Sequence, residues 1–117
     1  MSPASLETTI RDSDAGPVIE LRGEIDGGAK EALAAAYEDA PHEGRLLLEF
    51  AAVNYINSTG IALIVGLLAR ARSERRPVAA SGLSAHYREI FEITRIADFM
   101  TILSDEGTLP THQEEMA

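Results

Sequence analysis

The sequence contains no cysteine, and basic residues are scarce in it. Without cysteine, a disulfide framework, a thiolate metal site and a cysteine nucleophile are all excluded. Ten Lys and Arg stand against nineteen Asp and Glu, which leaves a formal net charge of −9 over 117 residues. Because a negative surface repels phosphate groups, we expect neither nucleic acid nor an anionic membrane surface as a partner.

A long hydrophobic run is also missing. The longest apolar stretch, residues 61–69, is less than half as long as the roughly 20 residues of a membrane-spanning helix. It predicts a buried helix and no membrane insertion. Residues 1–5 contain neither the basic nor the apolar segment of a secretory signal, so we expect a cytoplasmic location.

Sequence signatures of catalysis are absent as well. The chain has no glycine-rich phosphate-binding loop and no Gly-x-Ser-x-Gly elbow. Its histidines, His42, His86 and His112, lack the spacing of metal ligands. We expect His42 and His112 on the surface and His86 on a helix face, so the sequence predicts neither an enzyme nor a cofactor site.

The residues that are present are typical of one soluble domain, with 45% hydrophobic and 25% charged residues. Short apolar or β-branched runs alternate with helix-forming segments, which predicts an α/β fold with parallel strand pairs. The first two strands have a short connection and should pair antiparallel. We expect strands at residues 8–11, 18–22, 46–50, 78–81 and 101–103, and helices at residues 29–39, 58–76, 84–93 and 96–100.

The expected domain therefore covers residues 1–104, as a small mixed sheet of about four or five strands packed against about four helices. Residues 51–55 are expected to connect a strand to the following helix. Residues 105–117 are polar and contain Pro110, which predicts a loosely docked tail.

Polar residues mark the start of the expected helices. Asp26, the pair Asn57–Ser58, and Ser84 precede helical segments and are suitable N-caps. The arginines at residues 70–76 lie in the last turns of a helix, where they complement its dipole. The alternative, that they attract a nucleotide phosphate, has no phosphate-binding loop to support it.

Ser58 and Thr59 place two hydroxyl groups at the start of the helix that follows residues 46–50. A hydroxyl there can cap free backbone N–H groups. Alternatively, Ser58 can carry a phosphate, which adds about −1.5 to −2 charges. A helix N-terminus stabilises that charge, so the fold would tolerate the phosphate while an apolar or acidic partner would be expelled.

Three blocks of the sequence resemble the STAS domains of bacterial anti-sigma factor antagonists of the sporulation and general-stress type. Residues 21–26 (LRGEID) are similar to the end of an early strand of that family. Residues 46–63 are similar to its strand and Asp-Ser-[Ser/Thr]-Gly block, and residues 87–102 (YREIFEITRIADFMTI) to its closing helix and strand. The blocks span nearly the whole chain in the right order, so the resemblance implies the STAS fold.

The resemblance also implies a mechanism. Unphosphorylated antagonists of this family bind an anti-sigma factor that is also a serine kinase with a histidine-kinase-like ATPase fold, and this binding frees a sigma factor. The kinase ends the binding by phosphorylating a serine, and a PP2C-type phosphatase restores it. By position the phosphoacceptor is Ser58, with Thr59 as a secondary candidate. The implied partner-binding residues are Glu24, Asp26, Asn57, Ser58, Thr59 and Gly60.

Two positions depart from the family pattern. Asn57 stands where the family usually has aspartate, and residues 94–96 (TRI) replace the usual Thr-Gly-Leu turn. Asn57 keeps the capping geometry and loses the charge. It motivates an alternative function, a STAS scaffold that is not phosphorylated, such as an accessory subunit of a lipid-transporting ABC system. Gly60 is expected to permit the close approach of a partner's backbone.

Overall fold

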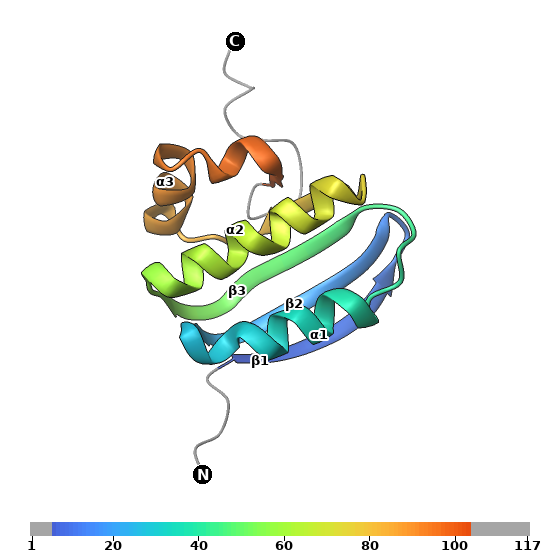
Figure 1. Ribbon diagram of the computed structural model, residues 1–117, viewed down its shortest axis with the longest axis horizontal. Helices are drawn as coiled ribbons and strands as arrows, with labels where there is room; N and C mark the ends of the chain where they lie inside the picture. Colours follow the sequence, from blue (N-terminus) through green and yellow to red (C-terminus); the bar gives the residue numbers. More distant parts are fainter. Residues whose placement is uncertain (1–5, 104–117) are drawn as a thin grey trace.

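The computed structural model describes residues 6–103, which form a sheet and its covering helices (Figure 1). The expected tail at residues 105–117 and His112 lie outside this range. The elements follow in the order β1 (Leu6–Ser13), β2 (Gly16–Ile25), the 3₁₀ turn η1 (Gly27–Ala29), α1 (Lys30–Asp39), β3 (Leu46–Ile56), α2 (Ser58–Ser73), β4 (Val78–Ser81), α3 (Ala85–Ile93), the 3₁₀ turn η2 (Ile96–Phe99) and β5 (Thr101–Ile102).

The five strands lie in the order β1-β2-β3-β4-β5. β1 and β2 pair antiparallel across a tight turn, and each later neighbour pairs parallel. The parallel pairs are joined through α1, α2 and α3, as parallel strands require a crossover. The prediction of an α/β domain with a small mixed sheet is confirmed, with three α-helices and two 3₁₀ turns in the described range.

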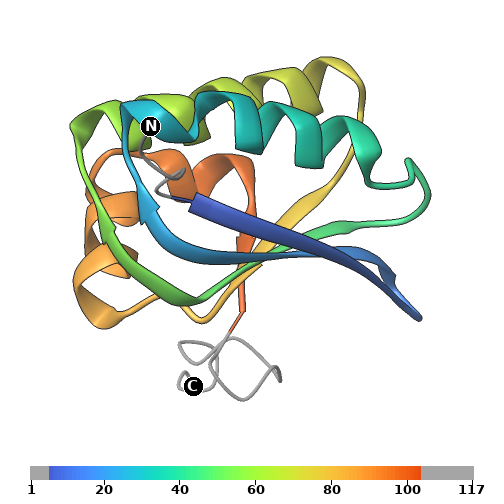
Figure 2. The same cartoon turned by 90° about the horizontal axis from the view of Figure 1, so that it is seen from below.

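Helices α1 and α2 lie side by side over one face of the sheet, as Figure 2 shows from below. Alternate strand residues point into the layer between the sheet and these helices. Among them, Ile19, Leu21 and Leu48 are at most 1% exposed. The helices contribute residues at helical spacing, including Leu33 of α1 and Ile64 of α2. Burial of this apolar layer supplies the main driving force for the fold.

Strand β3 is longer than expected. Residues 51–55 continue the strand to Ile56 and do not form a connection, because they remain paired with β2 through Val53↔Gly23 and Glu24↔Tyr55. Two register shifts interrupt this pairing, and four of the five residues are exposed. Bulges and exposure remove the apolar alternation that identifies a strand in sequence.

Helix α2 is shorter than expected. It ends at Ser73, and Arg75 turns the chain with a φ of 58°. Arg76 then lies buried, with 7% exposure, and donates hydrogen bonds to the backbone carbonyls of Tyr37, Ala40 and Pro41 at 3.2, 3.2 and 2.6 Å. Arg76 therefore caps the C-terminus of α1, where the sequence predicted only that it complements the dipole of its own helix.

Candidate functional site

The N-terminus of α2 is packed against the end of β2. The backbone N–H of Asn57 donates to the carbonyl of Ile25 at 3.2 Å. Gly60 is buried, and a Cβ atom there would overlap the carbonyl group of Ile25. The backbone that approaches Gly60 is thus that of the chain itself, which corrects the expectation that Gly60 admits a partner's backbone.

Asn57 is the N-cap of α2. Its backbone is extended, and its Oδ1 accepts a hydrogen bond from the N–H of Gly60 at 2.8 Å. Ser58 is therefore the first helical residue, it is exposed, and its hydroxyl does not perform the capping. The first backbone N–H groups of a helix have no acceptor within the helix. In α2, the N–H groups of Ser58 and Thr59 therefore stay available to solvent or to an anion.

The turn after β2 lies beside this helix start. The half-buried carboxylate of Asp26 accepts a hydrogen bond from the N–H of Gly28 at 2.9 Å and so caps η1, while α1, the helix it was expected to cap, has Ala29 as its N-cap and no side-chain cap. A Cβ atom at Gly27 would lie 3.6 Å from Cγ2 of Thr59, so the turn and the helix are in contact. Residues of both elements therefore lie on one face of the domain.

Two exposed residues extend this face along the strand ends. Glu24 and Tyr55 are register partners at the ends of β2 and β3, and Tyr55 is 52% exposed. Sequence reasoning identified Glu24 and missed Tyr55. The available signal was an aromatic residue three positions before Ser58, since aromatic side chains are enriched at the centres of protein interfaces.

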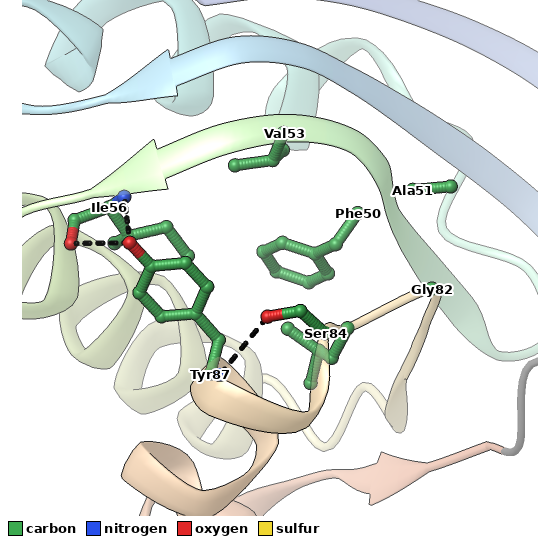
Figure 3. A pocket seen from close by; sticks show the side chains of 8 residues that line it. Phe50, Ala51, Val53, Ile56, Gly82, Ser84 and Tyr87 are labelled. Carbon is green, nitrogen blue, oxygen red and sulfur yellow. Dashed lines mark hydrogen bonds between the residues drawn. The ribbon is translucent and has the colours of Figure 1, made fainter.

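Tyr87 fixes the strand end that leads into the site (Figure 3). Its hydroxyl accepts a hydrogen bond from the N–H of Ile56 at 3.0 Å and lies 3.4 Å from the carbonyl oxygen of the same residue, to which it donates. Ser84 caps α3 by accepting from the N–H of Tyr87 at 3.2 Å, which confirms the predicted cap. The cavity between these elements measures about 290 Å³, and Phe50 and Val53 line it.

Sequence reasoning assigned Tyr87 only to the apolar stripe of a helix. Its hydrogen-bond partner, Ile56, lies 31 positions away in the chain, so no local pattern predicts the contact. Tyr87 positions the residue next to Asn57 and thereby the start of α2.

A network of groups with shifted pKa values lies at the opposite end of α2. The hydrogen bond from the Tyr37 hydroxyl is the main cause that lowers the pKa of Glu74, and Arg70 lowers it further. Burial raises the pKa of Tyr37. His42 lies 3.4 Å from Glu74 in this same network, with 47% of its side chain exposed, and His86 packs against the ring of Tyr87.

The site therefore offers an exposed acceptor hydroxyl at a helix N-terminus. The Ser58 hydroxyl makes no hydrogen bond to any of residues 6–103, so no general base is joined to it in that range. Within the same residues, no cluster of three metal-ligating side chains occurs. None of the described helices has the length and apolar character needed to cross a bilayer.

A five-stranded mixed sheet whose third strand leads through Asn57 and Ser58 into the second of two covering helices defines a STAS-type domain. The family model described as "Mlab, STAS domain" matches residues 8–104, and the chain belongs to this STAS domain family. The prediction from the sequence blocks is thereby confirmed.

Curated relatives and solved structures agree with this assignment. The anti-sigma-B factor antagonists of Listeria monocytogenes serovar 1/2a and Listeria innocua serovar 6a are each 31% identical over 107 residues, covering 90% of this chain and 93% of theirs. An anti-sigma factor antagonist from Mycobacterium paratuberculosis has a TM-score of 0.64 at 20% identity, covering 97% of this chain and 92% of its own. The unphosphorylated form of the antagonist SpoIIAA has a TM-score of 0.62 at 18% identity, covering 92% and 93%.

Proposed function

We propose that this protein is an anti-sigma factor antagonist that binds its partner through the face around Ser58 and is released when Ser58 is phosphorylated. The observation that carries the proposal is the exposed Ser58 hydroxyl, which the fold does not need because Asn57 performs the capping. The two Listeria relatives, both anti-sigma-B factor antagonists, support the antagonist function. The protein would act in the cytoplasm and not as an enzyme.

The partner is an anti-sigma factor that is also a serine kinase with a histidine-kinase-like ATPase fold, and a PP2C-type phosphatase reverses the modification. A phosphate on Ser58 would lie at the positive end of α2, near the N–H groups of Ser58 and Thr59. The added charge therefore leaves the fold intact. The partner surface, which packs against a neutral hydroxyl in the bound state, meets about −1.5 to −2 new charges instead.

The binding face would comprise Glu24, Asp26, Ser58 and Thr59 with Tyr55 as an aromatic anchor, while Asn57 and Gly60 shape it. Glu24 and Tyr55 are exposed, and Asp26 and Gly60 hold the turn and the helix in place. Because these carboxylates lie on a chain of net charge −9, the partner's facing surface should be basic. Association should then slow as ionic strength rises.

The proposal is tested on the chain purified with its kinase partner. Ser58→Ala should bind constitutively, and Ser58→Asp should weaken binding at least tenfold, because the added charge enters a desolvated interface. Thr59→Ala is the matched control for phosphorylation. Phosphopeptide mass spectrometry of protein from its native cells should find phosphate on Ser58 that changes with growth condition. Equal binding of the kinase partner by Ser58→Ala and Ser58→Asp would contradict the proposed control by phosphorylation of Ser58.

Asn57 favours one second candidate, a STAS scaffold that is never phosphorylated, such as an accessory subunit of a lipid-transporting ABC system. An amide at position 57 caps α2 and provides no carboxylate for a kinase or its Mg²⁺. A stable complex with a transporter ATPase that Ser58→Asp leaves unchanged would establish this function. An Asn57→Asp variant that gains phosphorylation would show that the amide is the reason for its absence.

A further inference from the structure

A groove between α1 and α2 lies outside the face around Ser58. It has a volume of about 230 Å³, and its apolar walls come from both helices, with Leu33 and Ala34 on one side and Leu63 and Leu67 on the other. Along α2 it extends from Ala62 to Arg70, which is about 12 Å at the helical rise of 1.5 Å per residue.

Gly66 in this groove has no role in the fold. It lies inside α2 and is exposed, and a Cβ atom there would meet no atom within 4 Å. Glycine inside a helix costs about 1 kcal/mol relative to alanine. Gly60 of the same helix, by contrast, is required by its contact with Ile25. The effect of glycine at position 66 is to keep the groove open.

The two ends of the groove differ in charge. Lys30, the first residue of α1, is exposed and forms no ion pair or hydrogen bond with residues 6–103. Arg70 at the other end is already paired with Glu38 and Glu74 at 3.3 and 3.2 Å. The groove therefore presents one unpaired cation, at the positive N-terminal end of α1.

We propose that this groove binds a small amphipathic anion, a medium-chain fatty acid, with its carboxylate at Lys30 and its alkyl chain along Gly66 towards Tyr37. An apolar trough with one polar end is the usual arrangement of a small-molecule site. A volume of about 230 Å³ restricts the ligand to a small molecule such as a medium-chain fatty acid. A two-turn groove is too short to serve alone as a protein interface, which buries about 800 Å² per partner.

The site is tested on the full chain by titration with sodium octanoate, followed by amide chemical shifts. Octanoate should bind in the micromolar to millimolar range and shift the amides of α1 and α2 around Gly66. Octylammonium chloride, with the opposite charge, should bind at least threefold more weakly. Lys30→Gln should weaken octanoate binding about three- to fivefold, as expected for an exposed charge pair.

Gly66→Leu should abolish binding by filling the groove. Ala69→Leu adds the same bulk on the same helix outside the groove lining and should bind octanoate as the natural chain does. Thermal unfolding serves as the folding check, and Gly66→Ala, which should weaken binding and raise the melting temperature, is the second variant. Octanoate binding that survives in Gly66→Leu, or no binding by the natural chain, overturns the proposal.

A failure of octanoate binding is distinguishable from a failure of the proposed antagonist function, since the titration contains no kinase and leaves Ser58 unchanged. If Gly66→Leu prevents capture by the kinase while octanoate does not bind the natural chain, the groove is a protein interface and the fatty-acid proposal is wrong.

Discussion

The two ends of α2 are built on different principles. At the N-terminus, one neutral side chain, Asn57, caps the helix and leaves Ser58 exposed. At the C-terminus, charged side chains satisfy one another and the end of α1 at the same time, as Arg70 and Arg76 do. The comparison teaches that charged side-chain interactions are concentrated at one end of the helix, while a hydroxyl that the fold does not use is kept at the other.

The charged end is centred on Tyr37. The guanidinium groups of Arg70 and Arg76 lie 4.6 and 4.7 Å from the centre of its ring. Its hydroxyl donates to Glu74 at 2.6 Å, and Glu74 also accepts from Arg70 at 3.2 Å. Charge-assisted bonds and cation–π contacts of this kind are stronger when partly desolvated.

The largest effect is expected at the uncharged end. Gly60→Ala should lower the free energy of unfolding by about 4 kcal/mol or more, because the new Cβ overlaps the carbonyl group of Ile25 and neither backbone can move away. Chemical denaturation measures the change. Gly66→Ala in the same helix is the control and should instead stabilise the chain by up to about 1 kcal/mol. Similar changes for the two variants would contradict the assigned contact.

The next effect is expected at the charged end. Arg76→Ala should lower the free energy of unfolding by about 2–4 kcal/mol, because it leaves the carbonyls of Tyr37, Ala40 and Pro41 without donors. Arg76→Lys should recover only part of this loss, since an ammonium lacks the planar fork. Arg72→Ala, at a more exposed arginine, should change stability by less than about 1 kcal/mol.

A smaller effect is expected from the cap itself. Asn57→Ala should lower the free energy of unfolding by about 1 kcal/mol through loss of the bond to Gly60. Asn57→Asp should keep the cap and gain about 0.3–1 kcal/mol at low salt from the helix dipole. Chemical denaturation measures the free energy of unfolding of both variants. If the gain in Asn57→Asp persisted at high salt, the helix dipole could not be its source.

The smallest effect concerns pH. The pKa of Glu74 is lowered, chiefly by the hydrogen bond from Tyr37, so its contribution is present above the ordinary value of 4.5 and lost as pH falls through the lower pKa of the folded state. Because burial raises the pKa of Tyr37, its contribution is present below 10.0 and lost as pH rises through the higher pKa of the folded state.

Melting temperature against pH measures both limits of this range. Glu74→Gln should flatten the acidic limb relative to the natural chain, while Ser58→Ala, at the opposite end of α2, should leave it unchanged. If the acidic limb of Glu74→Gln were identical to that of the natural chain, the Tyr37–Glu74 hydrogen bond would not contribute to the pH dependence of stability.

The features that could be predicted from the sequence are those with local causes. Asn57 and Ser84 mark helix starts because an N-cap accepts a hydrogen bond from a residue only three positions later. The order of elements follows from apolar periodicity in the same way. These signals placed Ser58 correctly at the start of a helix.

The features that escaped prediction depend on distant partners. Residues 51–55 are strand only because β2 pairs with them, and their own pattern lacks alternation. Arg76 and Tyr87 bond to backbone groups more than 30 positions away. Gly60 seemed suited to a partner, and its real neighbour, Ile25, belongs to another element of the same chain.

The cap that Arg76 places on α1 also bears on the order in which the chain assembles. Its three carbonyl partners lie 35 to 39 positions earlier, so these bonds form only after a long loop has closed. Interactions that form after the rate-limiting step slow unfolding and leave the folding rate almost unchanged. If the Arg76 bonds form after that step, Arg76→Ala should speed unfolding and leave the folding rate almost unchanged, and the lifetime of the folded chain then depends on an arginine at the opposite end of α2 from Ser58.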